Sequence, residues 1–154
     1  MPSIETRLAE LGIELPTAKS PTFNYVPYVV AGPLVFVSGQ LPWIGNEIRH
    51  RGKVGGELTV DQGKEAARLC AVNMLAHLRN ACDGDLDRVV RCVKLGGFVN
   101  CGPGFMDMPA VVDGASELIV AVFGEAGRHA RLAVGSGGLP RNVAVEIEGV
   151  FERR

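Results

Sequence analysis

The sequence lacks the features that mark membrane and nucleic-acid proteins. No apolar run approaches the ~20 residues that a membrane-spanning helix requires. The N-terminal residues 1–7 are polar and mixed in charge, unlike a signal peptide. The formal net charge is −1, so no basic face is expected that could follow a phosphate backbone. We therefore expect a soluble cytoplasmic protein with no membrane partner, and the charge argues against a nucleic-acid partner.

Metal-binding and disulfide patterns are also missing. The four cysteines include no C-x-x-C pair, and none of the three histidines lies near a cysteine at metal-ligand spacing. The cysteines are Cys70, Cys82, Cys92 and Cys101. We expect buried free thiols and no metal site.

The chain does have enough apolar material for one core. With 154 residues and 47% hydrophobic content, it suits one ordinary domain and leaves no room for a second. Residues 1–154 are therefore predicted to form a single domain, with a short helical extension at about residues 1–20. In that extension a helical period runs from Ile4 to Leu11 and ends at Gly12, a residue suited to a left-handed cap.

Glycine and proline divide the next part of the chain into strands and a loop. Val26 to Ala31 and Leu34 to Gln40 are rich in β-branched residues, and Gly32-Pro33 between them predicts a hairpin-type break. Glycines then cluster through residues 43–58, which predicts a loop with an edge hairpin at Gly45-Asn46.

Two longer helices are predicted in the second half. Thr59 to Gln62 resembles a capping box, and apolar residues then recur at helical spacing as far as Gly84. A second helix begins near Pro109, a residue suited to a first turn, and stops at Gly124.

The segment between these helices predicts strand. Residues 89–100 are rich in valine and form one or two strands, kinked or bulged at Gly96-Gly97. The expected element order is αββαββαβ. Two long helices packed on one face of a mixed sheet give an α+β fold.

The most informative residues come last. Arg131 and Glu146 lie on two strand-like segments joined by a Gly/Pro turn. A guanidinium can hold a carboxylate through two parallel hydrogen bonds, and a glutamate can orient water or move a proton. The alternative is a solvated cross-strand ion pair. Alternation along the last strand puts Glu146 and Glu148 on one side, where they would repel if both were buried.

The motifs around these residues resemble the RidA (YjgF/YER057c/UK114) family. They are Arg131-x-Ala-Val, Leu139-Pro140, Val145-Glu146-Ile147-Glu148, and the upstream stretch Leu34-Val35-Phe36-Val37-Ser38-Gly39-Gln40-Leu41-Pro42. The resemblance spans roughly Tyr25 to Phe151. It implies a chorismate-mutase-like α+β domain, assembled as a homotrimer with clefts between subunits.

The resemblance also implies a reaction, the hydrolysis of a 2-imino acid or its enamine tautomer to a 2-keto acid and ammonia. Arg131 matches the family's binder of the substrate carboxylate, and Glu146 matches the glutamate that activates water. The resemblance implies no cofactor, because an iminium carbon is already electrophilic.

Further matches lie along the implied cleft. Ser38 and Gly39 match the Ser-Gly of its wall, and Tyr25 has the spacing of its tyrosine, with Tyr28 as the alternative. Trp43 could line a ligand cleft, although a tryptophan after a strand more often covers the core.

Three departures from the family pattern put the substrate, and activity itself, in question. Ala133 stands where active deaminases commonly have cysteine, residues 102–109 form a longer segment than usual, and Asp113-Gly114 stands near the family's helix asparagine. A non-catalytic ligand-binding homotrimer therefore remains an alternative. A ribonuclease is a further alternative, which the absence of a basic groove and of a suitable histidine pair disfavours.

Overall fold

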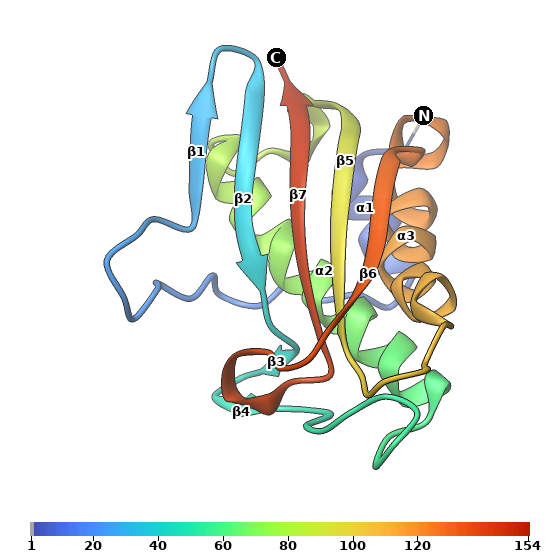
Figure 1. Cartoon of the computed structure of the whole chain (residues 1–154). Helices are drawn as coiled ribbons and strands as arrows, with labels where there is room; N and C mark the ends of the chain where they lie inside the picture. The colour runs from blue at the N-terminus through green and yellow to red at the C-terminus, as the bar shows by residue number, and fades with distance from the viewer. Residues whose placement is uncertain (1) are drawn as a thin grey trace.

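A computed structural model describes residues 2–154 and shows one mixed sheet with helices behind it (Figure 1). The elements are α1 Ile4–Glu10, β1 Tyr28–Ala31, β2 Leu34–Gln40, β3 Trp43–Ile44, β4 Glu47–Ile48, α2 Val60–Ala81, β5 Val89–Asn100, α3 Met108–Phe123, β6 Ala130–Ser136 and β7 Val145–Arg153. Three short 3-10 turns complete the list, at Leu86–Arg88, Gly124–Gly127 and Pro140–Asn142. Five strands form the mixed sheet in the order β1-β2-β7-β5-β6, with β5 and β6 parallel and the other pairs antiparallel, and β3 and β4 form a separate two-stranded sheet.

The first hairpin confirms the predicted break, because Gly32 adopts a φ of 59° between β1 and β2. The prediction that the first strand begins at Val26 is wrong by two residues. Pro27 has no N–H to donate to a ladder, and the Val26 carbonyl accepts a hydrogen bond from the Ser38 side chain instead. The predicted edge hairpin is present as β3 and β4.

Both long helices form where the sequence predicts them. The capping box of α2 is complete, since the Thr59 side chain accepts from Gln62 N and Gln62 Oε1 accepts from Thr59 N. The two helices cover one face of the sheet and form the core with it (Figure 1). Its largest fully buried side chains include Met74, Leu75, Leu95, Ile119, Ile147 and Phe151.

The predicted kink at Gly96-Gly97 is wrong. These glycines sit in regular register with β7, and β5 is one continuous strand whose irregularities lie earlier, between Val89 and Lys94. The glycines serve close packing instead, because a Cβ on Gly97 would lie 2.5 Å from a Val112 methyl of α3. The expected order αββαββαβ is therefore also wrong, since one strand precedes α3 and two follow it.

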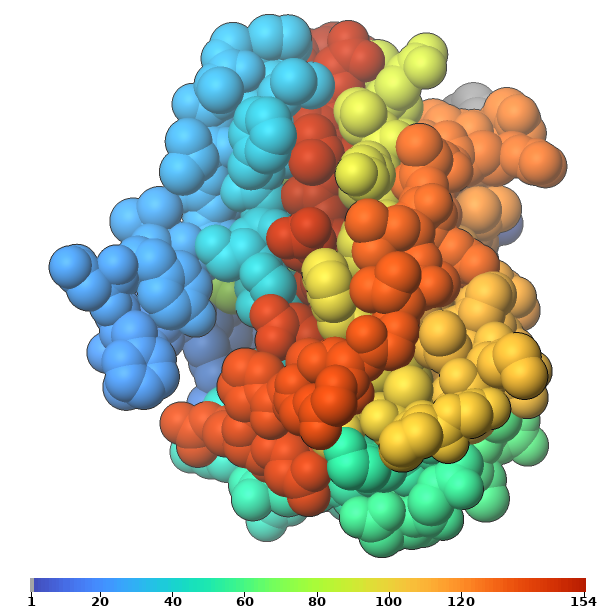
Figure 2. Space-filling model, viewed as in Figure 1, coloured from blue at the N-terminus to red at the C-terminus, as the bar shows by residue number. Residues whose placement is uncertain are grey.

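Within residues 2–154, no helix covers the other face of the sheet. Figure 2 shows the side chains of β2, β7, β5 and β6 as neighbouring columns on this open face. Val29, Phe36 and Val134 are 52%, 45% and 41% exposed there. An uncovered apolar sheet face is typical of a surface that meets another protein surface.

The structure also tests two predictions, that the cysteines are buried free thiols and that no helix spans a membrane. All four cysteines are free and buried. Among residues 2–154, no helix is both long and apolar enough to cross a membrane.

Candidate functional site

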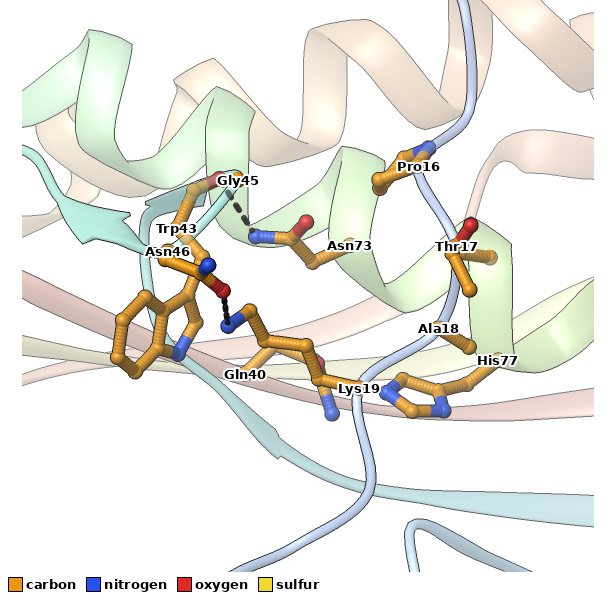
Figure 3. Close-up of a pocket in the computed structure, with 11 residues that line it drawn as sticks. Pro16, Thr17, Ala18, Lys19, Gln40, Trp43, Gly45, Asn46, Asn73 and His77 are labelled. Atoms are coloured by element: carbon orange, nitrogen blue, oxygen red, sulfur yellow. Dashed lines mark hydrogen bonds between the residues drawn. The ribbon is translucent and has the colours of Figure 1, made fainter.

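A cavity lies where β2 ends, beside the segment that precedes β1. Its volume is about 590 Å³. Figure 2 shows the hollow between that segment, in blue, and the cyan strand β2. Three of the lining residues are charged, namely Lys19, Arg141 and Glu146, and the others used below are Tyr25, Ser38, Gly39, Gln40, Trp43, Asn46 and His77. A neighbouring pocket of about 360 Å³ shares Lys19, Trp43 and His77 with it (Figure 3).

Glu146 enters this cavity from β7. Its neighbours Val145 and Ile147 are buried under the helices, so alternation points Glu146 and Glu148 to the open face, as predicted. The Glu146 side chain lies over Gly39, and a Cβ on Gly39 would overlap Glu146 Oε2. Glycine at position 39 therefore leaves the space that this carboxylate occupies.

The surroundings of Glu146 favour its protonated form. Partial burial raises the pKa of Glu146, and the negative charge of Glu148 raises it further. Within residues 2–154, no cation forms an ion pair with Glu146 to offset these effects. A carboxylate with a raised pKa is a stronger base than a solvated glutamate, which suits proton transfer from water.

The other predicted cleft residues lie beside Glu146. Tyr25 lines the cavity and is 54% exposed, whereas Tyr28 packs against the core. Ser38 lines the cavity as well, and its hydroxyl donates to the Val26 carbonyl at 2.7 Å. The structure therefore brings Tyr25, Ser38, Gly39 and Glu146 together around one space.

Arg131 lies elsewhere in the same chain. Its Nη1 donates to Asp113 Oδ1 at 2.6 Å and to Ser116 Oγ at 3.2 Å, and its Nη2 donates to the Pro109 carbonyl at 3.4 Å. All three partners belong to α3, so the guanidinium faces the helix side of the sheet. The ion pair with Asp113 occupies one side of its donor fork.

Within one subunit, Arg131 and Glu146 face opposite sides of the sheet. Arg131 pairs with Leu95 of β5, whereas Glu146 pairs with Phe98, three residues further along that strand. The interpretation of a cross-strand ion pair is therefore wrong. An ion pair of that kind needs neighbouring strands. Here β5 lies between them, because the chain passes through α3 to β6 on one side of β5 and then to β7 on the other side.

Sequence reasoning missed Lys19, Arg141 and His77. Lys19 lies in an irregular segment without periodicity, and His77 was hidden among the apolar residues of a helix. Trp43 lines the cavity. From the sequence, a tryptophan that covers the core was the favoured interpretation and a cleft residue the less favoured one.

Among residues 2–154, no group of three or more histidine, cysteine, aspartate or glutamate side chains is placed to hold a metal ion.

Comparison with known proteins relates this geometry to a family. The family model described as "YjgF/chorismate_mutase-like, putative endoribonuclease" matches residues 5–149. The chain belongs to the YjgF/RidA family. The expected chorismate-mutase-like α+β fold is thereby confirmed.

Three relatives illustrate the range within this family. Protein TCP17 of Trypanosoma cruzi is 47% identical, over 97% of this chain and 93% of its own. The crystal structure of Atu1372 from Agrobacterium tumefaciens, a protein of unknown function, is 48% identical with a TM-score of 0.92, over 98% and 92% of the two chains. RidA from the Antarctic bacterium Psychrobacter sp. is 27% identical with a TM-score of 0.60, over 88% and 94%.

Proposed function

We propose that this YjgF/RidA protein hydrolyses 2-imino acids, or their enamine tautomers, to 2-keto acids and ammonia. The observation that carries the proposal is Glu146, a carboxylate with a raised pKa that lies in a cavity beside Tyr25, Ser38 and Gly39. A structural relative, the Psychrobacter RidA, shares the fold over most of the chain.

The reaction needs one base that can return the proton it takes. Glu146 accepts a proton from water while the water oxygen bonds to the imine carbon, and the electrons of the C=N π bond move to nitrogen. The proton then passes to that nitrogen. As the C–N bond breaks, Glu146 takes the hydroxyl proton and passes it to the departing nitrogen, so that ammonia and the 2-keto acid are released. A glutamate of raised pKa suits both directions of this transfer.

Arg131 holds the substrate carboxylate, and it reaches the cavity from a neighbouring subunit. This part of the proposal rests on two features. Arg131 and Glu146 of one chain face opposite sides of the sheet, and β6, which carries Arg131, is an edge strand. The exposed Phe36 and Val134 on the open face supply apolar area for assembly. The active unit is then a homotrimer with sites between subunits.

A second candidate is a ligand-binding trimer without turnover. It is favoured by the Arg131–Asp113 ion pair, which engages part of the guanidinium, and by Ala133. The family description includes an endoribonuclease, so cleavage of RNA has to be assayed as well.

One experiment separates these functions. An amino-acid oxidase generates 2-imino acids in the presence of the wild type, of Glu146→Gln, or of the matched control Glu148→Gln, and release of the 2-keto acid is followed. We expect acceleration by the wild type and the control, with a loss of about 10²-fold or more in Glu146→Gln. Binding without acceleration would favour the ligand-binding protein, and RNA cleavage that needs Glu146 would favour the ribonuclease.

A further inference from the structure

Two cations approach the ring of Trp43 in the lining of the Glu146 cavity. Lys19 Nζ lies 4.4 Å and Arg141 Cζ lies 5.2 Å from the ring centroid. Lys19 Nζ also donates to Asn46 Oδ1 at 3.0 Å (Figure 3). Within residues 2–154, neither cation forms an ion pair with a carboxylate. Their charges are therefore available to a ligand.

The backbone around these residues is held in place. Asn73 of α2 donates to the carbonyls of Leu41 and Trp43 at 3.0 and 3.1 Å, which fixes the chain that carries the ring. Arg141 has a φ of 56°, a conformation that costs energy in residues other than glycine. The fold therefore keeps this arginine in a strained position next to Trp43.

His77 adds an unsatisfied polar atom on the inner side. Its side chain is only 4% exposed, it lines both cavities, and its Nδ1 has no hydrogen-bond partner in residues 2–154. Figure 3 shows the His77 ring reaching from α2 toward the chain at Ala18 and Lys19. Burial lowers the pKa of His77, so the neutral ring can offer one N–H to a ligand oxygen. A buried polar atom without a partner is a further sign of a ligand position.

We infer that Lys19 and Arg141, beside Trp43 and His77, form a second anion subsite, and that the substrates are 2-imino acids whose side chain ends in a carboxylate. This inference rests on the proposed function, in which Arg131 of a neighbouring subunit holds the first carboxylate. When Glu146 is ionised, as its role as a base requires, the cavity has two cations against one carboxylate. One further carboxylate then balances that charge, whereas a phosphate dianion exceeds it.

Trp43 provides a direct readout because it is the only tryptophan in the sequence. Its fluorescence is titrated with glutarate and with pentanoate, which have the same chain length and differ by one terminal carboxylate. We expect glutarate to bind about tenfold more tightly or better. Equal affinities for the two ligands, or an equally strong response to inorganic phosphate, would overturn the inference.

Two variants test the residues themselves. Lys19→Gln removes the charge and keeps a group that can contact Asn46, and Arg141→Asn removes the charge with a residue that tolerates positive φ. Each should lose most of the preference for glutarate, whereas Arg128→Gln, an exposed cation outside the cavity, should keep it. Retention of the preference in both cavity variants would refute the assignment.

Turnover distinguishes this inference from the proposed function. We expect a lower KM for 2-iminoglutarate than for 2-iminopentanoate, and Arg141→Asn should raise the KM for 2-iminoglutarate. Hydrolysis of both imino acids with equal KM would support the proposed deaminase activity and refute the second anion subsite. Preferential binding of glutarate without any hydrolysis would support the second anion subsite and refute the proposed deaminase activity.

Discussion

Gly39→Ala places a methyl group where the Glu146 carboxylate lies. A Cβ at position 39 would overlap Glu146 Oε2, and it would lie 2.9 Å from Glu146 Cδ and 3.1 Å from Cγ. Carbon atoms normally pack at about 3.5–4.0 Å. The carboxyl end of Glu146 must therefore move, while β2 can stay, because φ of Gly39 lies outside the positive region.

The size of the effect follows from which atoms move. The displaced group is the end of a flexible, partly buried side chain, so the loss in the free energy of unfolding should lie near the lower end of the roughly 1–3 kcal/mol seen for overpacking. A misplacement of ~1 Å at a reacting group costs about 10²-fold in rate. We therefore expect a large loss of turnover with little loss of stability.

Gly96→Ala is the matched control. A Cβ on Gly96 would lie 2.9 Å from Glu148 Cγ and Oε1, so it displaces the neighbouring glutamate in the same way. Thermal unfolding and imino-acid turnover are measured for both variants. If Gly96→Ala reduces kcat as much as Gly39→Ala does, or if Gly39→Ala remains fully active, the role given to Glu146 is wrong.

Three further predictions concern charge. The kcat/KM should fall as pH decreases through the Glu146 pKa, which is raised above the ordinary glutamate value, and Glu148→Gln should move this acid limb to lower pH, as a pH–rate profile would show. Because the folded-state pKa of Glu146 is raised, the stability that this residue contributes in acid is lost as pH rises through that pKa. Chemical denaturation should therefore find Glu146→Gln more stable than the wild type at neutral pH. The two proteins should be equally stable well below the unfolded-state pKa. Burial raises the pKa of Cys92 to about 12 and also raises that of Cys70, so thiol reagents at pH 8 should label neither until the protein unfolds, and rapid labelling of the native protein would contradict their burial.

The parts of the fold that local chemistry determines could be predicted from the sequence. The Thr59 capping box, the Gly32 turn and the alternation around Glu146 depend on neighbours in the chain, and all three are confirmed. The Gly96-Gly97 prediction failed because those glycines make room for Val112 and Glu148, which are distant in sequence.

The candidate site divides in the same way. The resemblance to the family predicted Tyr25, Ser38, Gly39 and Glu146, and they line one cavity. The face to which Arg131 points depends on strand order, because β5 inserts between β6 and β7. Lys19 and Arg141 reach Trp43 only through tertiary packing, so no local pattern could have predicted their contact.

A subunit-mixing experiment tests the central claim most directly. Arg131→Ala and Glu146→Gln variants, each inactive alone, are mixed in equal amounts under conditions that allow subunits to exchange, and imino-acid turnover is measured. If each site takes Arg131 and Glu146 from different subunits of a closed ring, random mixing should restore about one quarter of wild-type activity, since that share of interfaces pairs an intact arginine with an intact glutamate. Exchange confirmed by mass spectrometry without any recovery of activity would contradict the shared site.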